Sequence, residues 1–548
     1  MKLSPVDVVV VGAGAAGGIV AEQLSLAGLH VALLERGPRL GFAQTRHDEL
    51  YSQRTTVLGN AFGPDDAHYV RLVEGLDGKT RRVLPSEGAY NNIAACVGGG
   101  TTSYGAMAWR FMERDFRMKS TYGAPPGSTL EDWPITYSDL EPFYTKAEWE
   151  IGVSGKAGAN PFEAPRSKAY PMPALPYNTE AGVLDKAAQR LGWHAFPIPM
   201  AINSIPYQKR PACIACPHCV GFACEVNAKN STAVTVIPRA VATGHCDLRV
   251  GCQAKRIVMA SGSRAASVEY FQGQTLVEQP CRAVVVSCSA TETPRLLFQS
   301  ATQLHPRGLG NRNDWVGRNL QGHAYCGADG LFENEVFDGL GPAARIASCR
   351  FSHGLPGGLK GGALMGNEFI REPYLFSRSM IPPGVPRWGA EHKRFVQRYY
   401  KRSVSLRAPV QEMPVFESRV QLAPEPTDFW GMPTVKISGH RHPQDREVAR
   451  FLVARMQEWL TEAGATRTWT SLPGEGVSGG QHQAGTCRMG SDPKTSVVDA
   501  NCRIHDLDNV WVVDGSVHVN NGGFNPSLTI QAIAYHASTR IASALRVS

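Results

Sequence analysis

The hydrophobic positions near the N-terminus predict a strand, a helix and a second strand in close succession. Residues 7–11 are almost entirely apolar, which is typical of a strand buried within a parallel sheet. Residues 18–24 follow with a helical pattern, and residues 30–35 form a second apolar run that ends in an acid, Glu35. This order predicts a β-α-β unit, in which the helix covers one face of two neighbouring strands.

A glycine-rich turn joins the first strand to the helix, with GxGxxG spacing and two alanines at Gly12, Gly14, Ala15, Ala16 and Gly17. In such a turn the first glycine bends the chain, the second admits a pyrophosphate, and the third lets the helix pack closely. The positive end of the helix then faces the phosphates. Glu35 lies 18 residues beyond Gly17, close to the roughly 20 expected of an acid that binds a ribose hydroxyl. The pattern predicts dinucleotide binding and disfavours NADP, but it does not separate NAD from FAD.

Two further clusters carry candidate functional groups. A second glycine-rich cluster consists of Gly98, Gly99, Gly100, Thr101 and Tyr104. The other cluster begins at His482 and reads His-Gln-Ala-Gly-Thr-Cys-Arg-Met-Gly through residue 490. Imidazole titrates near neutral pH, so a histidine in such a cluster is a candidate acid–base group.

The C-terminal segment predicts one more strand and a helix. Residues 510–513 form a short apolar run that is followed by Asp514 and Gly515. Asn525-Pro526 then opens a helix expected to run through Ala534, with proline in its first turn. The start of that helix offers backbone N–H groups and a positive dipole end to whatever lies in front of it.

With these motifs together, the chain resembles the glucose-methanol-choline (GMC) oxidoreductases, FAD-dependent enzymes that oxidise alcohols. Besides the N-terminal fingerprint and the C-terminal region of His482 and Asn525, the matching segments are residues 98–108, 290–297 and 316–320. Residues 133–135 and 139–144, with a cysteine cluster described below, look most like the large subunits of bacterial gluconate and sugar dehydrogenases.

The resemblance implies an α/β fold, α+β overall, with a Rossmann-like FAD/NAD(P)-binding domain interleaved with an antiparallel-sheet substrate domain. The FAD-binding domain is expected to comprise residues 1–125, 210–325 and 480–548. The substrate-binding domain is expected to comprise residues 126–209 and 326–479.

The resemblance also assigns catalytic roles. Oxidation of an alcohol by flavin requires that a hydride leave the carbon while the hydroxyl proton goes elsewhere. His482 matches the family's catalytic histidine and is expected to accept that proton. Asn525 matches the second position of the catalytic pair, which is His in some members and Asn in others, and is expected to hold the substrate oxygen. Four other histidines have no comparable motif and are interpreted as structural or as supports behind the site: His323, His505, His518 and His536.

The C-terminal motifs favour FAD over NAD. The residues expected to bind FAD are Gly12, Gly14, Ala15, Ala16, Gly17, Glu35, Gly98, Gly99, Gly100, Thr101, Tyr104, Asp514, Gly515, Asn525 and Pro526. Some relatives bond FAD covalently through a histidine where this chain has Ser103. A serine does not make that bond, so non-covalent FAD is expected.

Four of the thirteen cysteines lie within one short segment with spacing C-x2-C-x2-C-x4-C, namely Cys213, Cys216, Cys219 and Cys224. Thiolates this close in sequence suit a metal or an iron–sulfur cluster. In the related sugar dehydrogenases, a cysteine-rich segment at this place holds a three-iron cluster that passes electrons to a cytochrome subunit. An iron–sulfur cluster, zinc or another structural metal, and disulfides or free thiols all stay open.

Composition and charge exclude several other classes of protein. With 548 residues, 43% hydrophobic and 19% charged, the chain is neither disordered nor too short for a large core. Thirteen cysteines are too few, and odd in number, for a disulfide scaffold. The net charge of +8 is spread over the chain without the like-charge run typical of nucleic-acid binding. No apolar run is long enough to predict a membrane span.

The sequence therefore predicts an FAD-dependent dehydrogenase that acts on a sugar, sugar acid or polyol. The expected electron acceptor is a cytochrome or quinone, with a possible small-subunit partner. A cytoplasmic location is expected, with export to the periplasm on a partner subunit as the alternative. Two other functions stay open: an oxidase that uses O2 on a primary alcohol of a glycoside or aminosugar, and a non-catalytic electron-transfer or scaffold subunit. The residues around Trp388 either line a sugar pocket or form a packed helix face.

Overall fold

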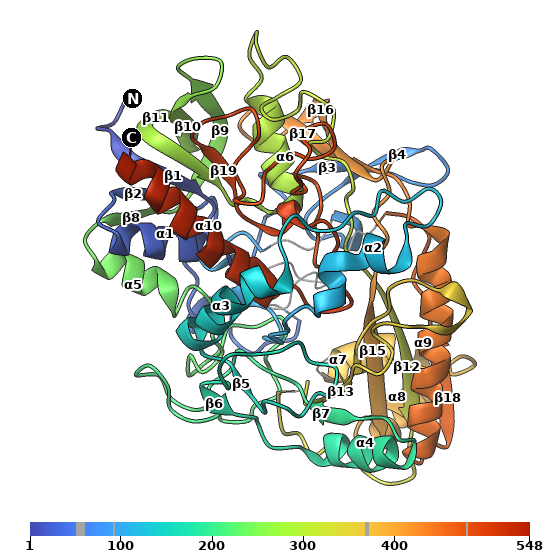
Figure 1. Cartoon of the computed structure of the whole chain (residues 1–548). Coiled ribbons are helices and arrows are strands. Elements are labelled where there is room, and N and C mark those ends of the chain that lie inside the picture. Colours follow the sequence, from blue (N-terminus) through green and yellow to red (C-terminus); the bar gives the residue numbers. More distant parts are fainter. Residues whose placement is uncertain (51–60, 91–93, 343, 368–371, 478–480, 548) are drawn as a thin grey trace.

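The computed structural model describes residues 1–50, 61–90, 94–342, 344–367, 372–477 and 481–547. Two large sheets organise the molecule, and segments far apart in the sequence meet in each of them (Figure 1). Both termini lie beside the first sheet, and the second sheet lies at the opposite end of the molecule (Figure 1). One sheet is mainly parallel and the other is antiparallel, so the predicted fold class is confirmed.

The first sheet contains the predicted β-α-β unit. In spatial order its strands are β8 (Cys246–Arg249), β2 (Val31–Leu34), β1 (Val6–Val11), β11 (Thr275–Val286), β10 (Ala265–Gln272) and β9 (Cys252–Met259), with β19 (Val510–Val512) beside β11. β8, β2, β1 and β19 run parallel to the C-terminal half of β11, whose N-terminal half pairs antiparallel with β10. Residues 8–11 of β1 are fully buried, as expected of an apolar strand covered on both faces.

Helices cover this sheet. α1 (Gly17–Leu26) packs against α5 (Val236–Ala242) and α10 (Ser527–Val547), and α10 also packs against α3 (Tyr137–Ala147). The last helix continues well beyond the expected end at Ala534. Its apolar face stays buried to its final turns, so packing maintains the helix over that length.

The second sheet is antiparallel. In spatial order its strands are β18 (Arg467–Ser471), β12 (His323–Leu331), β15 (Ser403–Gln411), β14 (Met365–Gly366), β13 (Ile346–Ser348) and β7 (Ala195–Pro197). α9 (Pro443–Glu462) packs across β12, β15 and β18, and α4 (Thr179–Arg190) packs on α9 (Figure 1). β12 and β15 pair along their whole lengths, so the first residue of β12 lies opposite the last residue of β15.

A third sheet joins the two predicted domains. Its strands are β16 (Arg419–Thr427), β17 (Pro433–Ser438), β3 (Arg71–Glu74) and β4 (Thr80–Val83), and a small pair is formed by β5 (Ser154–Gly155) and β6 (Met172–Pro173). β17 comes from the predicted substrate domain, and it pairs in parallel with β3 from the predicted FAD domain. The domain boundaries remain predictions.

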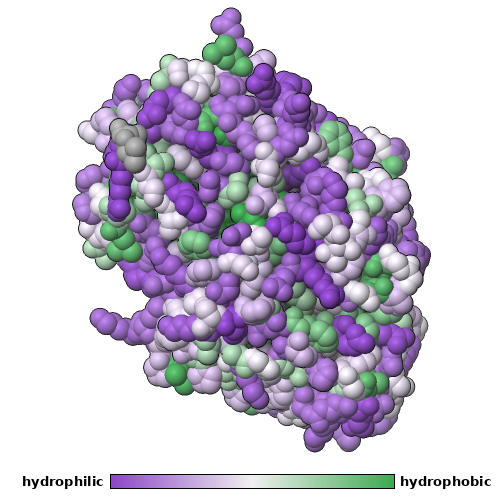
Figure 2. Space-filling view, viewed as in Figure 1, coloured by the Kyte–Doolittle hydropathy of each residue, from purple (hydrophilic) through white to green (hydrophobic). Residues whose placement is uncertain are grey.

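The remaining α-helices are α2 (Met118–Tyr122), α6 (Ser289–Gln299), α7 (Pro373–Ser379) and α8 (Gly389–Tyr399). α8 buries Phe395 against Phe376 of α7, whereas Trp388 is 84% exposed. This segment is therefore a packed helix face rather than a pocket wall. The face of the molecule in Figure 2 is mostly hydrophilic, with apolar residues scattered among polar ones. None of the described helices has both the length and the apolar character needed to cross a membrane.

Candidate active site

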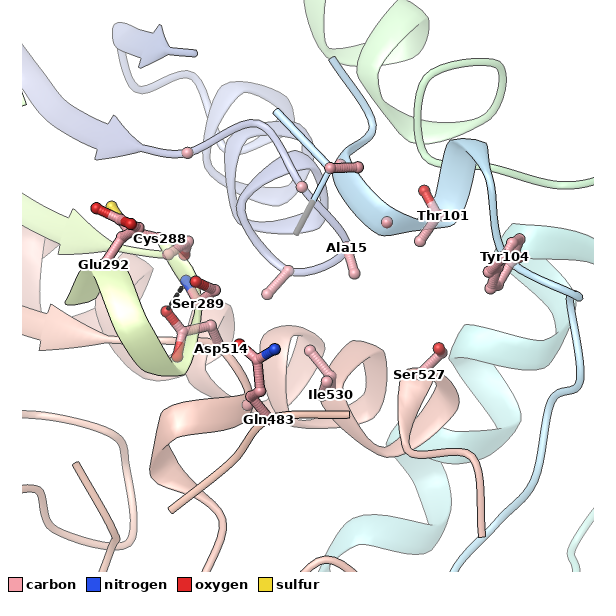
Figure 3. A pocket seen from close by; sticks show the side chains of 18 of the residues that line it. Ala15, Thr101, Tyr104, Cys288, Ser289, Glu292, Gln483, Asp514, Ser527 and Ile530 are labelled. Atoms are coloured by element: carbon pink, nitrogen blue, oxygen red, sulfur yellow. Dashed lines mark hydrogen bonds between the residues drawn. The ribbon is translucent and has the colours of Figure 1, made fainter. Parts of the chain in front are cut away.

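A cavity of about 300 Å³ opens at the C-terminal ends of β1, β2, β11 and β19, beside the start of β12. This edge of a parallel sheet is where α/β folds bind their ligands. Ala15 and Thr101 project from one wall, and Gln483 and Ile530 project from the opposite wall (Figure 3). Along the cavity, the end with Ser289, Glu292 and Asp514 lies opposite the end with Tyr104 and Ser527 (Figure 3).

The glycine turn of the β-α-β unit forms part of the first wall. Gly12 has a φ of +101°, and a Cβ there would lie 2.3 Å from the carbonyl oxygen of Ser287. A Cβ at Gly17 would lie 1.9 Å from the carbonyl oxygen of Gly12, so only glycine lets the helix approach the strand this closely. At Gly14 a Cβ would meet nothing within 4 Å, and this residue lines the cavity. The start of α1 thus faces open space that admits a pyrophosphate.

Glu35 follows β2, where the sequence predicts a ribose-binding acid. Its Oε2 accepts a hydrogen bond from the backbone N–H of Ala13 at 3.0 Å, and its Oε1 accepts one from Gly37 at 2.9 Å. Burial raises the pKa of this carboxyl group, and the two backbone donors oppose that shift. The side chain lines the cavity in a fixed position, from which its oxygens can accept hydrogen bonds from ribose hydroxyls.

Asp514 ties two segments of the opposite wall together. Its Oδ2 accepts a hydrogen bond from the backbone N–H of Ser289 at 3.0 Å (Figure 3). The same oxygen accepts one from the hydroxyl of Thr293 at 2.6 Å. Its Oδ1 accepts from the backbone N–H of Ser516 at 2.8 Å, which caps the short 3-10 turn after β19. The carboxylate therefore fixes the turn after β11 against the turn after β19.

His482 lies in the segment between β18 and β19 and lines the cavity. It adopts a left-handed backbone conformation, with φ +65°, which costs about 1–3 kcal/mol for a residue with a side chain. The Nδ2 of Asn521 donates a hydrogen bond to the His482 carbonyl oxygen at 2.5 Å. Beside it, Gln321 and Ala484 exchange two backbone hydrogen bonds at 2.9 and 3.2 Å. These contacts hold His482 next to the start of β12.

His323, the first residue of β12, fixes the protonation pattern of His482. Its Nε2 lies 2.8 Å from the carbonyl oxygen of Gly522 and 3.1 Å from that of Asn521, so Nε2 carries the proton. Burial lowers the pKa of His323, which keeps its ring neutral and leaves Nδ1 as an acceptor. The Nδ1 of His482 lies 2.9 Å from that atom and donates to it. The Nε2 of His482 is then the nitrogen that can accept a proton.

Asn525 lies just before α10 and is also buried at the cavity. Its Nδ2 donates a hydrogen bond to the hydroxyl oxygen of Tyr325 at 3.2 Å. Its Oδ1 is buried without a hydrogen-bond partner among the described residues. The structure thus brings the predicted catalytic residues His482 and Asn525 to one cavity, each beside a residue of β12.

Most of the predicted FAD-binding residues line this cavity: Gly12, Gly14, Ala15, Ala16, Glu35, Gly99, Gly100, Thr101, Tyr104, Asp514, Gly515 and Asn525. Gly17, Gly98 and Pro526 do not line it. Gly17 permits the close helix packing described above, and Gly98, with φ +91°, begins the turn that contains Thr101. Pro526 accepts the first backbone hydrogen bond of α10, from Ile530. Their roles toward the cofactor remain predictions.

Ser103 gives an independent sign that the cavity receives a polar ligand. Its hydroxyl is buried at the cavity without a hydrogen-bond partner among the described residues, and buried polar groups are rarely left unpaired. Together with the open space at Gly14 and the placement of Glu35, this fits a flavin nucleotide.

We expect acid or heat precipitation of the purified protein to release all of its FAD into the supernatant, because Ser103 forms no covalent bond to it. The measurement is the visible absorbance of the pellet and of the supernatant. Flavin that stays with the denatured protein after washing would contradict this expectation.

Models of the family described as GMC oxidoreductase match residues 7–325 and 414–534. The chain belongs to the GMC oxidoreductase family. The resemblance inferred from the sequence motifs is confirmed, and so is the prediction of an enzyme that uses FAD and acts on CH–OH groups.

This GMC oxidoreductase is similar to relatives of two kinds. It is 31% identical to 6'''-hydroxyparomomycin C oxidase of Streptomyces lividus, over 98% of this chain and 92% of that protein. It is 28% identical to the gluconate 2-dehydrogenase flavoprotein of Pantoea cypripedii, over 98% of this chain and 94% of that protein. The crystal structure of pyridoxine 4-oxidase from Mesorbium loti has the same fold, with a TM-score of 0.65 at 19% identity over 98% and 99% of the two chains.

The four-cysteine loop lies directly behind the cavity wall. Val220 of this loop lines the cavity, and the backbone N–H of Gly221 donates to the carbonyl oxygen of Ser103 at 2.7 Å. The thiols of Cys213, Cys216, Cys219 and Cys224 surround a separate space of only about 10 Å³. Across the described ranges, no three His, Cys, Asp or Glu side chains are placed to hold a metal ion. No disulfide joins the thirteen cysteines, and nothing in the described residues supports an iron–sulfur cluster or zinc here, so a metal at this loop remains a prediction.

Sequence reasoning did not single out Tyr325, which contacts Asn525 at the cavity. His323 was interpreted as structural or supporting, and the structure places it in direct contact with His482. The sequence did hold a sign that His323 lies close to the site, because it follows the family-matching segment 316–320 by only three residues. Of the other histidines, His518 lies behind the site, where its Nδ1 is 3.1 Å from the Oδ1 of Asn521.

Proposed function

We propose that this chain is an FAD-dependent dehydrogenase that oxidises a CH–OH group of a neutral sugar or polyol and passes the electrons to a cytochrome or quinone. The observation that carries the proposal is that His482 and Asn525 line one cavity together with the glycine turn of the β-α-β unit, each in contact with a residue of β12. Bound FAD supplies the hydride acceptor. The Nε2 of His482 takes the hydroxyl proton, and the hydrogen bond from His482 Nδ1 to His323 selects the tautomer of the neutral ring whose lone pair lies on Nε2.

The lining of the cavity supports an uncharged substrate. Among the described residues, the charged side chains that line it are Glu35, Arg36, Glu292, Arg295 and Asp514. All five come from the turns after β2 and β19 or from α6, where the nucleotide is expected. Gln481 and Gln483 flank His482, Ser527 follows Asn525 by two residues, and Tyr325 contacts both catalytic residues; these four lining residues are neutral. Hydroxyl groups match such a lining, whereas a buried cation or anion needs an opposite charge.

An oxidase acting on an aminosugar is the second candidate. The 31% identity to 6'''-hydroxyparomomycin C oxidase over nearly the whole chain favours it. The chemistry at His482 is the same in both cases. The two candidates differ in the charge of the substrate and in the acceptor that reoxidises the flavin.

One experiment distinguishes them. The anaerobic holoenzyme is mixed with D-glucose, D-fructose and glycerol as neutral compounds, D-gluconate as an anion and 6'''-hydroxyparomomycin C as a cation, and the loss of flavin absorbance is followed. The reduced enzyme is then exposed to air or to a quinone. We expect a neutral compound to bleach the flavin fastest and the quinone to reoxidise it faster than air does. Fastest bleaching by the aminoglycoside, with stoichiometric hydrogen peroxide in air, would contradict the first candidate and support the second.

A further inference from the structure

One strand contacts both catalytic residues. His323 and Tyr325 are two positions apart at the start of β12, so their side chains project from the same face of the strand. Ala324 between them projects the other way and is fully buried in the core under α9. His323 contacts His482, and Tyr325 contacts Asn525. The contact of His323 with His482 orients a catalytic ring. The contact of Tyr325 with Asn525 brings a phenol hydroxyl beside the other catalytic residue.

The phenol of Tyr325 lies among the groups that meet the substrate. It lines the cavity and is half-buried. Its ring centre is 5.9 Å from that of His482, with an angle of 45° between the rings. Its oxygen already accepts the hydrogen bond from Asn525 Nδ2 at 3.2 Å. A phenol hydroxyl also carries a proton, so Tyr325 is able to act toward a substrate as a hydrogen-bond donor.

The neighbouring amide carries an acceptor that the described residues leave unpaired. The Oδ1 of Asn525 is buried and has no partner among the described residues, which leaves a strong acceptor unpaired in the absence of a ligand. The opposite end of the same amide is held by Tyr325. A substrate that enters here meets a proton acceptor on His482, an acceptor on Asn525 and a donor on Tyr325.

We propose that Tyr325 is a third substrate-contacting residue of this site, whose hydroxyl donates a hydrogen bond to the oxygen of the reacting CH–OH group. The inference rests on the proposed function. As the substrate O–H bond breaks, its proton moves to His482 Nε2 and negative charge develops on the oxygen while the hydride leaves the carbon. The Tyr325 O–H bond stays intact and stabilises that charge, as a donor in an oxyanion hole does.

The test is Tyr325→Phe, which removes one oxygen and keeps the ring that packs beside His482. In the anaerobic holoenzyme, with the best substrate of the panel above, we expect the limiting rate of flavin reduction to fall about 10²-fold, the range found when one oxyanion donor is lost. The substrate concentration at half-saturation and the FAD content are expected to change little. Tyr399→Phe is the matched control, because Tyr399 lies on α8 and packs against Phe395.

A double variant separates a direct role from a structural one. If Tyr325 and Asn525 act on the same oxygen, Tyr325→Phe combined with Asn525→Ala costs less than the product of the two single effects. A Tyr325→Phe enzyme that reduces its flavin at the wild-type rate would overturn the inference, and so would one that loses only FAD or thermal stability. Failure of the wild-type enzyme to bleach with any compound of the panel would instead refute the proposed function.

Discussion

Replacing His482 by alanine is expected to slow flavin reduction by about 10²- to 10⁴-fold, the usual contribution of a positioned general base. His482 is the cavity residue whose Nδ1 proton is committed to His323 and whose Nε2 can therefore accept a proton. Asn525, the other predicted catalytic residue, carries an amide that does not take up a proton at neutral pH. The base function therefore falls on a single side chain.

The measurement is stopped-flow bleaching of the anaerobic His482→Ala holoenzyme, with its FAD content determined beforehand. We expect FAD binding to be retained, because the nucleotide wall is built from Gly14, Glu35 and Asp514. His194→Ala is the control, since His194 is exposed and does not line the cavity. Near-normal reduction by the His482 variant would remove this residue from the chemistry.

Glu292→Gln is expected to lower the free energy of unfolding by about 3–5 kcal/mol, the cost of removing one partner from a buried ion pair. Glu292 is the buried carboxylate at which three guanidinium groups meet. Its Oε1 lies 2.5 Å from Arg71 and 3.6 Å from Arg36, and its Oε2 lies 3.5 Å from Arg295. The amide keeps the shape of the side chain but leaves these cations with less negative charge.

The stability effect of Glu292 depends on pH with a defined sign. Burial alone would raise the pKa of this carboxyl, but the three arginines lower it well below its ordinary value of about 4.3. A lowered folded-state pKa stabilises the protein above the unfolded-state pKa, and the stability is lost as the pH falls toward the folded-state value. The difference between wild type and Glu292→Gln should therefore be full at pH 6–8 and shrink below about pH 4.

The free energy of unfolding of both proteins is measured by denaturant titration. Saturating FAD is present throughout, so that a difference in cofactor binding does not change the comparison. Glu131→Gln is the matched control. Glu131 pairs with Lys119 at 2.5 Å, but both side chains are more than 40% exposed, so the change should cost less than about 0.5 kcal/mol. Equal losses of unfolding free energy in Glu292→Gln and Glu131→Gln would show that the buried charge of Glu292 does not stabilise the protein through the three arginines.

The parts of the site that are formed by residues close together in the sequence could be predicted from the sequence alone. The turn at Gly12, Gly14 and Gly17 and the acid at Glu35 follow from periodicity and spacing within one β-α-β unit. Residues 510–512 likewise form the predicted strand, in parallel with β11. In these segments, neighbours in the sequence are also neighbours in space.

The contacts that complete the site could not be predicted in this way. The contact of His323 with His482 depends on backbone hydrogen bonds between Gln321 and Ala484, which come from distant parts of the chain. The position of Tyr325 depends on which face of β12 is turned to the cavity, and β12 is fixed by pairing with β15 and β18. The four-cysteine loop is a different case. Its spacing suits a metal, but no three ligating side chains are placed to hold one in the described part of the chain, so spacing alone does not establish a metal site.

The central claim is that a CH–OH carbon gives a hydride to the flavin bound at this cavity while His482 takes the hydroxyl proton. The most direct measurement is the limiting rate of anaerobic flavin bleaching by the best substrate of the panel, compared with the same compound deuterated at every carbinol carbon. We expect complete bleaching and a severalfold slower rate with the deuterated compound, because the carbon–hydrogen bond breaks in the step observed. Equal rates for the two compounds, or a flavin that no alcohol of the panel reduces, would contradict it.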